Sequence, residues 1–290
     1  MMRRLKSLRS LKNKVVLIAG GSGGIGKAIA FEAARRGAIV IVCARKLAVL
    51  KQIASRCMIL SGRPAFSFAL DLTDPDEIDH ILDQVRHEVG EIDVLINAAG
   101  VGDLVEVTNQ PRYSMAKMVN VNLLAAMYLS RSVAKQMMDQ GYGAIINVAS
   151  LGGKIPIPGS AVYSASKAGL IHFSNILRME VADYGVQVLT VNPGPVKTSF
   201  FDSADPSHRL IAHFPAWMFI TPETLAKQIW DSVGYKRREI NVPTYTAQLS
   251  WIYQMVPGLG DWAIKKFFDY QQNKKNWFRR LRISVTCHGC

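Results

Sequence analysis

Short apolar runs recur along the first 242 positions, and segments long enough for helices separate them. These runs are apolar at successive positions rather than at alternate ones, which is typical of strands buried on both faces. The strands are expected at Val15–Ala19, Ile39–Cys43, Ala65–Leu70, Val94–Ile96, Ala144–Val148 and Gln187–Val191. The pattern therefore predicts a parallel sheet with helices on both faces, a doubly wound α/β fold.

Helix ends are marked by residues that suit caps. Helical spacing after the cluster Gly20–Gly26 predicts a first helix that ends at Gly37, a plausible left-handed C-cap. A second helix is expected over Lys46–Arg56. A third is expected to start after the cap at Thr73–Pro75 and to run to Val89.

The 290 residues are enough for one large domain with a substantial core. We expect a basic N-terminal segment over 1–13, the doubly wound domain over 14–242, and an aromatic and basic C-terminal extension over 243–290. Within the domain, residues 195–220 mix aromatic residues with prolines and histidines without clean periodicity. They predict a substrate lid or loop, although packing of these aromatic residues against the sheet is an equal alternative.

The formal net charge of +13 lies mostly at the two ends of the chain. Residues 1–14 carry six basic residues and no acid, and residues 261–290 carry a net +5. A nucleic-acid-binding protein would carry positive charge across the fold itself, so no nucleic-acid partner is expected. Peripheral contact with an anionic membrane surface fits basic termini better, and solvated tails are the alternative.

Other targeting signals are weak. No apolar run approaches the ~20 residues of a membrane-spanning helix, and the N-terminus lacks the apolar core of a signal peptide. The four cysteines (Cys43, Cys57, Cys287 and Cys290) are few and irregularly spaced, which predicts no disulfide framework and no structural metal site. We therefore expect a cytoplasmic protein, with peripheral attachment to a membrane surface left open, and an exposed tail at its C-terminus.

A glycine cluster stands between the first strand and the first helix. It fits the spacings Gly21-x-Gly23-x-x-Gly26 and Gly20-x-x-x-Gly24-x-Gly26. Glycines permit a tight turn and close approach of the backbone to a pyrophosphate, while the helix N-terminus supplies N–H donors. The position of the cluster therefore predicts dinucleotide binding.

The end of the second strand bears on the choice of cofactor. A carboxylate there would hold the ribose 2′-hydroxyl of NAD, whereas arginine accommodates the 2′-phosphate of NADP. The chain has Arg45 and Lys46 at this point, and no acidic residue lies between them and Asp71. The cofactor is therefore expected to be NADP (NADPH), with NAD less favoured. The alternative is that Arg45 and Lys46 merely begin an exposed helix.

Tyr163 and Lys167 share one face if their segment is helical. An ammonium group in that position would lower the pKa of the phenol from about 10. Such a phenol can pass a proton to or from a carbonyl or alcohol oxygen. Taken alone, the pair is a weak signal, because most pairs with this spacing lie on a solvated helix surface.

In order and spacing, the motifs together resemble those of the short-chain dehydrogenase/reductase family. The resemblance covers about residues 14–242 and rests on Gly20-x3-Gly24-Ile25-Gly26, Asn97-Ala98-Ala99-Gly100, Asn122, Ser150, Tyr163-x3-Lys167 and Asn192-Pro193-Gly194. It implies a Rossmann-type parallel sheet of about seven strands and an oxidoreductase that transfers a hydride.

The resemblance also implies roles for individual residues. Tyr163 would be the general acid/base, Lys167 would lower its pKa and bind the nicotinamide ribose, Ser150 would hold the substrate oxygen, and Asn122 would anchor a water in a proton relay. No metal is implied. With Arg45 and Lys46, the cofactor-binding residues would be Gly20, Ser22, Gly23, Gly24, Ile25, Gly26, Asp71, Leu72, Asn97, Ala98, Ala99, Gly100, Tyr163, Lys167, Pro193, Gly194, Val196 and Thr198.

The chain departs from the family pattern at two points. Ala19 stands where the family usually has threonine, and the glycine turn lacks the basic residue that some NADP-dependent members carry there. The expectation of NADP therefore rests on Arg45. Asn120 competes with Asn122 for the water-anchoring role, and we expect Asn120 to be a helix-capping residue instead.

The aromatic character of 195–220 favours a hydrophobic ketone or secondary alcohol as substrate, of a lipid-, steroid- or retinoid-like kind. A reductase of soluble 3-oxoacyl thioesters and a non-catalytic NADP-sensing protein are the alternatives. The resemblance further implies a homodimer or homotetramer. His208 and His213 are expected to be loop or surface residues rather than metal ligands, and the extension suits either a bilayer interface or subunit packing.

Overall fold

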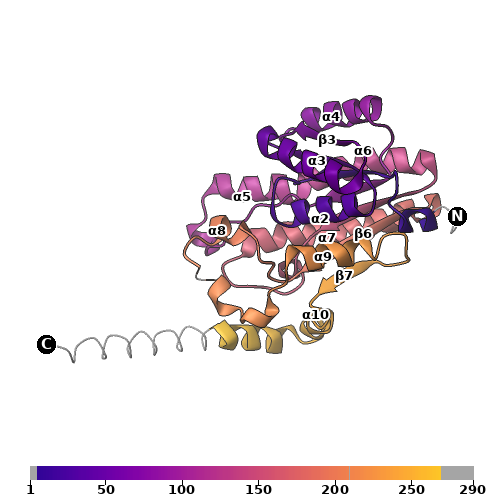
Figure 1. Cartoon of the computed structure of the whole chain (residues 1–290). Coiled ribbons are helices and arrows are strands. Elements are labelled where there is room, and N and C mark those ends of the chain that lie inside the picture. Colours follow the sequence, from indigo (N-terminus) through magenta and orange to yellow (C-terminus); the bar gives the residue numbers. More distant parts are fainter. Residues whose placement is uncertain (1–4, 209, 269–290) are drawn as a thin grey trace.

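The fold is a single parallel sheet with helices on both faces. The computed structural model describes residues 5–208 and 210–268 (Figure 1). Its strands pair in the order β3-β2-β1-β4-β5-β6-β7, all parallel. They are β1 (Val15–Ala19), β2 (Ile39–Ala44), β3 (Ala65–Ala69), β4 (Val94–Asn97), β5 (Gly143–Val148), β6 (Val186–Pro193) and β7 (Glu239–Val242). The predicted doubly wound α/β fold is confirmed.

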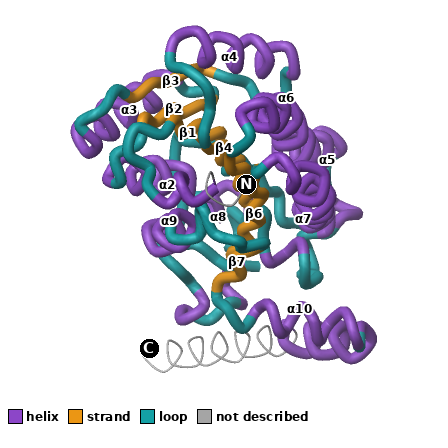
Figure 2. Tube along the Cα trace, turned by 90° about the vertical axis from the view of Figure 1, so that its right-hand side faces the viewer, coloured by secondary structure: helices purple, strands orange, loops and turns teal. Residues whose placement is uncertain are grey.

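Two layers of helices cover the sheet. On one face lie α2 (Gly24–Arg35), α3 (Leu47–Ser61) and α9 (Pro222–Trp230), and on the other lie α4 (Pro75–Glu88), α5 (Arg112–Val119), α6 (Ala125–Gln140) and α7 (Ala161–Val181) (Figure 2). Each face has its own cluster of buried apolar residues. Strands apolar at successive positions feed both clusters, which explains the uninterrupted apolar runs in the sequence.

Several predicted boundaries agree closely with the structure. β1 has the predicted bounds, and α4 begins after Asp74, whose carboxylate accepts hydrogen bonds from the N–H groups of Asp76 and Glu77. The helix expected to end at Arg56 was predicted too short. It continues to Ser61 because no residue breaks it before Gly62, which has a left-handed backbone conformation (φ 62°).

The N-terminal segment packs against the domain. Leu8 and Leu11 are buried, and the Arg9 guanidinium lies 4.1 Å from the centroid of the Tyr235 ring. The Arg9 side chain also donates a hydrogen bond to the Gly234 carbonyl at 3.2 Å. The described part of this basic segment is therefore anchored to the fold rather than a solvated tail.

The C-terminal extension is helical as far as the structure describes it. Its first helix is α10 (Thr246–Met255), which follows β7. Before the extension, the 195–220 segment contains the short helix α8 (Phe200–Ala204). Residues 257–268 form a further helical stretch. None of the helices within the described ranges has both the length and the apolar character needed to cross a membrane. The expected tail at Cys287–Cys290 lies outside the described residues.

Asp93 fastens the start of β1 to its neighbours. Its buried carboxylate accepts hydrogen bonds from the Val15 N–H at 2.8 Å and from the Tyr142 hydroxyl at 2.6 Å. The Lys14 ammonium donates a third, at 3.0 Å. Loss of the carboxylate would leave three polar groups without their acceptor, which is costly where water is largely excluded.

We expect Asp93→Ala to lower the free energy of unfolding by about 3 kcal/mol. The matched control is Asp83→Ala, which removes an exposed ion pair with Arg86 and should cost no more than about 0.5 kcal/mol. Urea unfolding of both variants checks the prediction, and equal losses would contradict it.

Candidate active site

A large cavity opens at the carboxyl ends of the strands. It measures about 1010 Å³, and segments that follow β1, β2, β4, β5 and β6 line it. Starting from β1, the strands β2 and β3 are added on one side of the sheet, and the strands β4 to β7 are added on the other side. The cavity therefore lies at the point where the strand order reverses, which is where doubly wound folds bind ligands.

Glycines at two positions let the turn after β1 close tightly. A Cβ at Gly26 would overlap the Gly20 carbonyl oxygen, and a Cβ at Gly20 would overlap the backbone of Ala99. Gly20 also has a φ of 89°, which side chains rarely allow. The turn thus holds β1, α2 and the segment after β4 in contact at the cavity wall.

The start of α2 is open toward the cavity. Its cap residue, Gly23, makes no side-chain cap, the first turn contains no acidic residue, and Gly23 to Ile25 line the cavity. A Cβ at Gly23 would meet no atom within 4 Å. Unpaired N–H groups at such a helix end suit an anion, so the residues present fit the pyrophosphate of a dinucleotide.

Besides the glycine turn and the start of α2, the cavity is lined by Arg45, Asp71 and Leu72, which follow β2 and β3. Hydrogen bonds from the Thr73 N–H and hydroxyl lower the pKa of the Asp71 carboxyl, and the charge of Arg45 contributes in the same direction. Arg45 is exposed at the cavity edge and thus free to meet a phosphate. Arg45 therefore places a cation at this end of the cavity.

Two of the predicted cofactor residues lie outside the cavity lining. Lys46 is exposed and caps the start of α3. The Asn97 side chain points into the core, where it donates hydrogen bonds to Asn147 Oδ1 at 2.7 Å and to Ser130 Oγ at 3.0 Å. The remaining predicted cofactor residues all line the cavity: Gly20, Ser22, Gly23, Gly24, Ile25, Gly26, Arg45, Asp71, Leu72, Ala98, Ala99, Gly100, Tyr163, Lys167, Pro193, Gly194, Val196 and Thr198.

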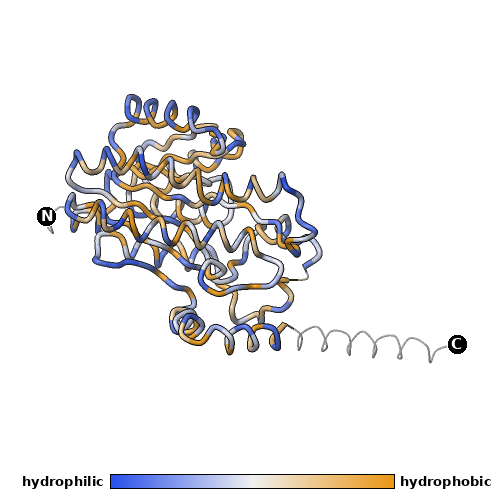
Figure 3. Tube along the Cα trace, turned by 180° about the vertical axis from the view of Figure 1, so that it is seen from behind, coloured by the Kyte–Doolittle hydropathy of each residue, from blue (hydrophilic) through white to orange (hydrophobic). Residues whose placement is uncertain are grey.

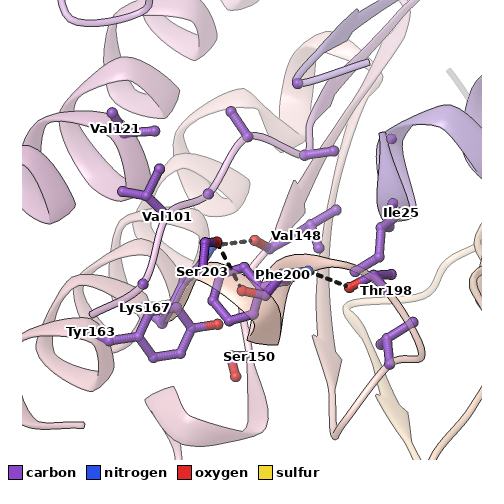
Figure 4. A pocket seen from close by; sticks show the side chains of 18 of the residues that line it. Ile25, Val101, Val121, Val148, Ser150, Tyr163, Lys167, Thr198, Phe200 and Ser203 are labelled. Carbon is purple, nitrogen blue, oxygen red and sulfur yellow. Dashed lines mark hydrogen bonds between the residues drawn. The ribbon is translucent and has the colours of Figure 1, made fainter. Parts of the chain in front are cut away.

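The other half of the cavity brings together Ser150, Tyr163 and Lys167 (Figure 4). Tyr163 and Lys167 share the inner face of α7, and Ser150 follows β5 directly. Ser150 hydrogen-bonds to Tyr163, and its Oγ accepts the Gly152 N–H at 3.1 Å. The Lys167 ammonium is buried and donates to the Val148 carbonyl at 2.9 Å. Two hydroxyl groups are thereby aimed at one place in the cavity.

The pKa of Tyr163 differs in direction from the expectation. Burial raises it, and the hydrogen bond from Ser150 lowers it only in part. Burial lowers the pKa of Lys167 to about 8, and its ammonium donates to the Val148 carbonyl. The phenol is therefore held in its protonated form, ready to donate.

Asn122 supports the site from behind the cavity wall. Its side chain is fully buried, accepts the Val101 N–H at 2.8 Å and donates to the Val101 carbonyl and the Ser166 hydroxyl, both at 3.0 Å. Both amide hydrogens are used in this way. Asn122 ties the segment after β4 to α7.

The cap expected at Asn120 does not form. Asn120 begins a π-helical turn, Asn120–Leu124, within a helix that continues from α5 into α6, so there is no helix end for its side chain to cap. Turns of this kind are frequent at functional sites because they disrupt the regular hydrogen-bond ladder. Asn120 instead lines the cavity.

Helix α8 covers the cavity beside Tyr163. The rings of Phe200 and Tyr163 lie 5.7 Å apart between centroids, and the Ala204 carbonyl accepts the Leu104 N–H at 2.7 Å. A Cβ at Gly102 would come within 2.7 Å of the Phe200 ring. The small residue thus lets α8 dock against the segment after β4, and this part of the 195–220 region serves as a cover.

Several cavity residues were not predicted from the sequence. They come from irregular segments and from the exposed side of α5, where no motif marks them, although the aromatic content of 195–220 was a signal for Phe200, Phe201 and Phe214. The unpredicted lining side chains include Val101, Leu104, Tyr113, Lys117, Val121, Val148, Leu151, Ile157, Phe200, Phe201, Leu210 and Phe214.

The two histidines of this region have different environments. His208 is exposed, as expected, whereas His213 is buried against the Phe268 ring at 5.1 Å between centroids. His213 therefore lies in the loop, as one of the two expected alternatives has it, but not at the surface, because the C-terminal helical stretch covers it. Over residues 5–208 and 210–268, no group of His, Cys, Asp or Glu side chains is arranged to hold a metal ion.

The sequence matches the family model described as short chain dehydrogenase over residues 14–208. It is 34% identical over 222 residues to a 3-oxoacyl-[acyl-carrier-protein] reductase of Vibrio cholerae, which covers 76% of this chain and 89% of that protein. A ketoacyl reductase of Nostoc sp. is 36% identical over 189 residues, 65% of this chain and 66% of that protein.

A solved structure agrees with these sequence matches. A short-chain dehydrogenase from Sphingobium yanoikuyae in complex with NADPH superimposes with a TM-score of 0.74 at 26% identity. The superposition covers 85% of this chain and 94% of that one. The likeness therefore covers most of the chain.

The buried ammonium of Lys167 makes stability depend on pH. The native chain releases this proton near pH 8, whereas the unfolded chain keeps it up to about its ordinary value of 10.5. Between these values the unfolded state binds more protons, so the wild type gains stability as pH rises. Relative to Lys167→Met, we expect a gain of about 2 to 3 kcal/mol between about pH 7 and about pH 10. Parallel urea unfolding of the two proteins measures it, and a difference that stays constant with pH would refute it.

Proposed function

The chain belongs to the short-chain dehydrogenase family, and on that premise we propose that it transfers a hydride between NADP(H) and a hydrophobic ketone or secondary alcohol. The observation that carries the proposal is the convergence of Ser150, Tyr163 and Lys167 between two halves of one cavity. One half is polar and glycine-rich, and the other is apolar. At about 1010 Å³ the cavity is at the upper end of ligand pockets, which suits two ligands side by side.

The chemistry assigned to the chain's own residues is proton transfer and charge stabilisation. NADPH, when bound, supplies the hydride. The Ser150 and Tyr163 hydroxyls donate hydrogen bonds to the substrate oxygen, so the negative charge that develops there meets donors already in place. Tyr163 then gives its proton to that oxygen. Burial raises the pKa of the Tyr163 phenol, so the group carries the proton that ketone reduction needs.

A substrate of apolar character is supported by the lining beyond Tyr163. Four segments supply large apolar side chains there: Leu104, Leu151, Ile157, Phe200, Phe201, Leu210 and Phe214. Burying a substrate against such a surface is favourable in proportion to the apolar area removed from water. A small polar ketone would leave much of this surface without a partner.

Reduction of a thioester-bound 3-oxoacyl group is the second candidate, because the Vibrio relative is named a 3-oxoacyl-[acyl-carrier-protein] reductase and the Nostoc relative a ketoacyl reductase. It uses the same proton donor and the same hydride chemistry. The two candidates differ in the part of the substrate beyond the oxygen-bearing carbon. A free lipid-like ketone is apolar throughout, whereas a carrier-bound acyl group leaves its carrier in solvent.

We expect Tyr163→Phe to lower the turnover number for ketone reduction by about 10²- to 10⁴-fold, because the phenol is the group that supplies the proton. NADPH binding, followed by the change in cofactor fluorescence, should remain within about threefold of wild type, since the phenyl ring preserves the cavity wall. A non-catalytic NADP-sensing protein would show no turnover in the wild type either, and this result would refute the proposal.

The same assay distinguishes the substrate classes. NADPH oxidation is compared for long-chain 3-oxo lipids, steroid and retinoid ketones, short ketones and a 3-oxoacyl thioester. A hydrophobic-ketone reductase should give the highest kcat/KM with the free apolar ketones. Preference for the thioester would establish the second candidate in its place.

We expect Arg45→Ala to raise the Kd of NADPH by about tenfold or more and to leave that of NADH nearly unchanged. The reason is that a guanidinium–phosphate contact is charge-assisted and worth about 1.5 to 3 kcal/mol. Lys46→Ala is the matched control, since Lys46 is the adjacent exposed cation outside the cavity lining. Titration calorimetry measures both, and equal effects of the two substitutions would contradict the assignment.

A further inference from the structure

Helix α10 has its apolar and polar sides reversed with respect to the fold. Its buried residues are Thr246 and Ser250, both small and polar. Its large apolar side chains face outward, and Trp251 and Met255 are each 64% exposed. A helix that belongs to a water-soluble surface ordinarily has the opposite arrangement. The outward side therefore requires an apolar partner.

The exposed apolar surface continues beyond α10. Leu259 and Trp262 are about as exposed as Trp251, and the preceding loop adds Trp217 at 69%. We call this set the C-terminal apolar face, and Figure 3 shows its helices along the lower edge of the fold. Its members are Trp217, Leu249, Trp251, Ile252, Met255, Val256, Leu259, Trp262 and Phe267. Contiguous exposed apolar surface of this kind marks a site of interaction.

The face is held in shape by contacts among its own elements. The Tyr253 hydroxyl donates a hydrogen bond to the Asp261 carboxylate at 2.9 Å, and a Cβ at Gly260 would overlap the Tyr253 ring. The Trp217 and Tyr245 rings lie 5.9 Å apart. The two helical stretches and the loop thus form one preorganised surface rather than separate tails.

Charge along the sequence indicates what covers this surface. Residues 246–260 contain no charged residue, and the next charged positions are Asp261, which accepts the Tyr253 hydroxyl, and then Lys265 and Lys266. The Lys266 ammonium lies 4.8 Å from the centroid of the Trp262 ring. Tryptophans beside lysines, next to an uncharged apolar stretch, form the arrangement that suits the interface of an anionic bilayer.

The face also borders the cavity. Phe268, at the end of the described helical stretch, contacts the ring of His213 and lies 6.5 Å from that of Phe214, which lines the cavity. The same loop carries Trp217 of the apolar face. A molecule dissolved in a bilayer against this face would therefore meet the loop that forms the apolar wall of the cavity.

We infer that the C-terminal apolar face docks in the plane of an anionic lipid bilayer. The aromatic and aliphatic side chains bury themselves at headgroup depth, and Lys265 and Lys266 contact lipid phosphates. If the proposed function holds, the bilayer also presents the apolar ketone to the cavity. The docking itself does not depend on any turnover.

Flotation of the full chain with vesicles tests this inference. The probes are phosphatidylcholine vesicles with and without phosphatidylglycerol. We expect the wild type to float with the anionic vesicles and Trp251→Gln/Trp262→Gln to bind at least about tenfold more weakly. Lys265→Gln/Lys266→Gln should weaken binding to the anionic vesicles by about tenfold and hardly affect the neutral ones.

Met58→Gln/Ile59→Gln is the matched control, because these α3 side chains are also exposed and apolar but lie outside the face. It should bind like the wild type. Wild type that stays with the soluble fraction, or a tryptophan variant that floats equally well, would overturn the inference. So would sedimentation showing that the tryptophan substitutions only dissociate a dimer, because the face would then bind a second copy of the chain.

A second readout separates this inference from the proposed function. In the tryptophan variant, NADPH oxidation with a short water-soluble ketone should equal that of the wild type, while oxidation with a long-chain ketone supplied in anionic vesicles should fall at least about fivefold. Flotation without turnover on any ketone would uphold docking and refute the proposed function. Turnover without flotation would do the reverse.

Discussion

The close contact between Gly20 and the backbone of Ala99 is the constraint on which the site depends. A side chain at Gly20 would occupy the space of that backbone, so only glycine lets the ends of β1 and β4 come together. These are the strands between which the sheet order reverses. Their approach opens the start of α2 toward the cavity and sets Gly100 next to the Lys167 ammonium, 3.4 Å from a Cβ built at that glycine. The dinucleotide half and the proton-transfer half of the cavity are thereby joined.

The orientation of α7 depends on a chain of buried hydrogen bonds beneath the cavity. Asn97 donates to Asn147 at 2.7 Å, Asn147 donates to Ser174 Oγ at 2.8 Å, and Ser174 donates to the Leu170 carbonyl. Buried polar groups of this kind are costly unless paired, so they specify one register between β4, β5 and α7. That register directs Lys167 at the Val148 carbonyl. The buried polar residues thus position the side chains of Tyr163 and Lys167.

The sequence predicted the elements of the fold better than the directions of their side chains. Apolar runs and caps placed β1 and the start of α4 correctly, since these signals are local. They could not show that Asn97 faces the core while Ala98 faces the cavity, because this depends on how β4 meets α6. Nor could they show that burial outweighs the hydrogen bond from Ser150 in setting the pKa of Tyr163. Its pKa is raised by the removal of water, a property of the packed molecule and not of the spacing between Tyr163 and Lys167.

In the C-terminal extension, too, the sequence predicted the character of the segment but not the directions of its side chains. The extension is rich in aromatic and basic residues, and this composition left two alternatives for its partner, a bilayer interface or another subunit. What composition could not provide is the direction of α10, whose Thr246 and Ser250 face the fold while Trp251 faces outward. Such a reversal is unfavourable in water, because apolar area stays hydrated while two hydroxyls are buried. Both hydroxyls are satisfied within one turn, by the carbonyls of Pro243 and Ala247. Burying the two hydroxyls therefore costs little free energy. The unfavourable contribution that remains is the apolar surface exposed to water, and contact with lipid removes this surface from water.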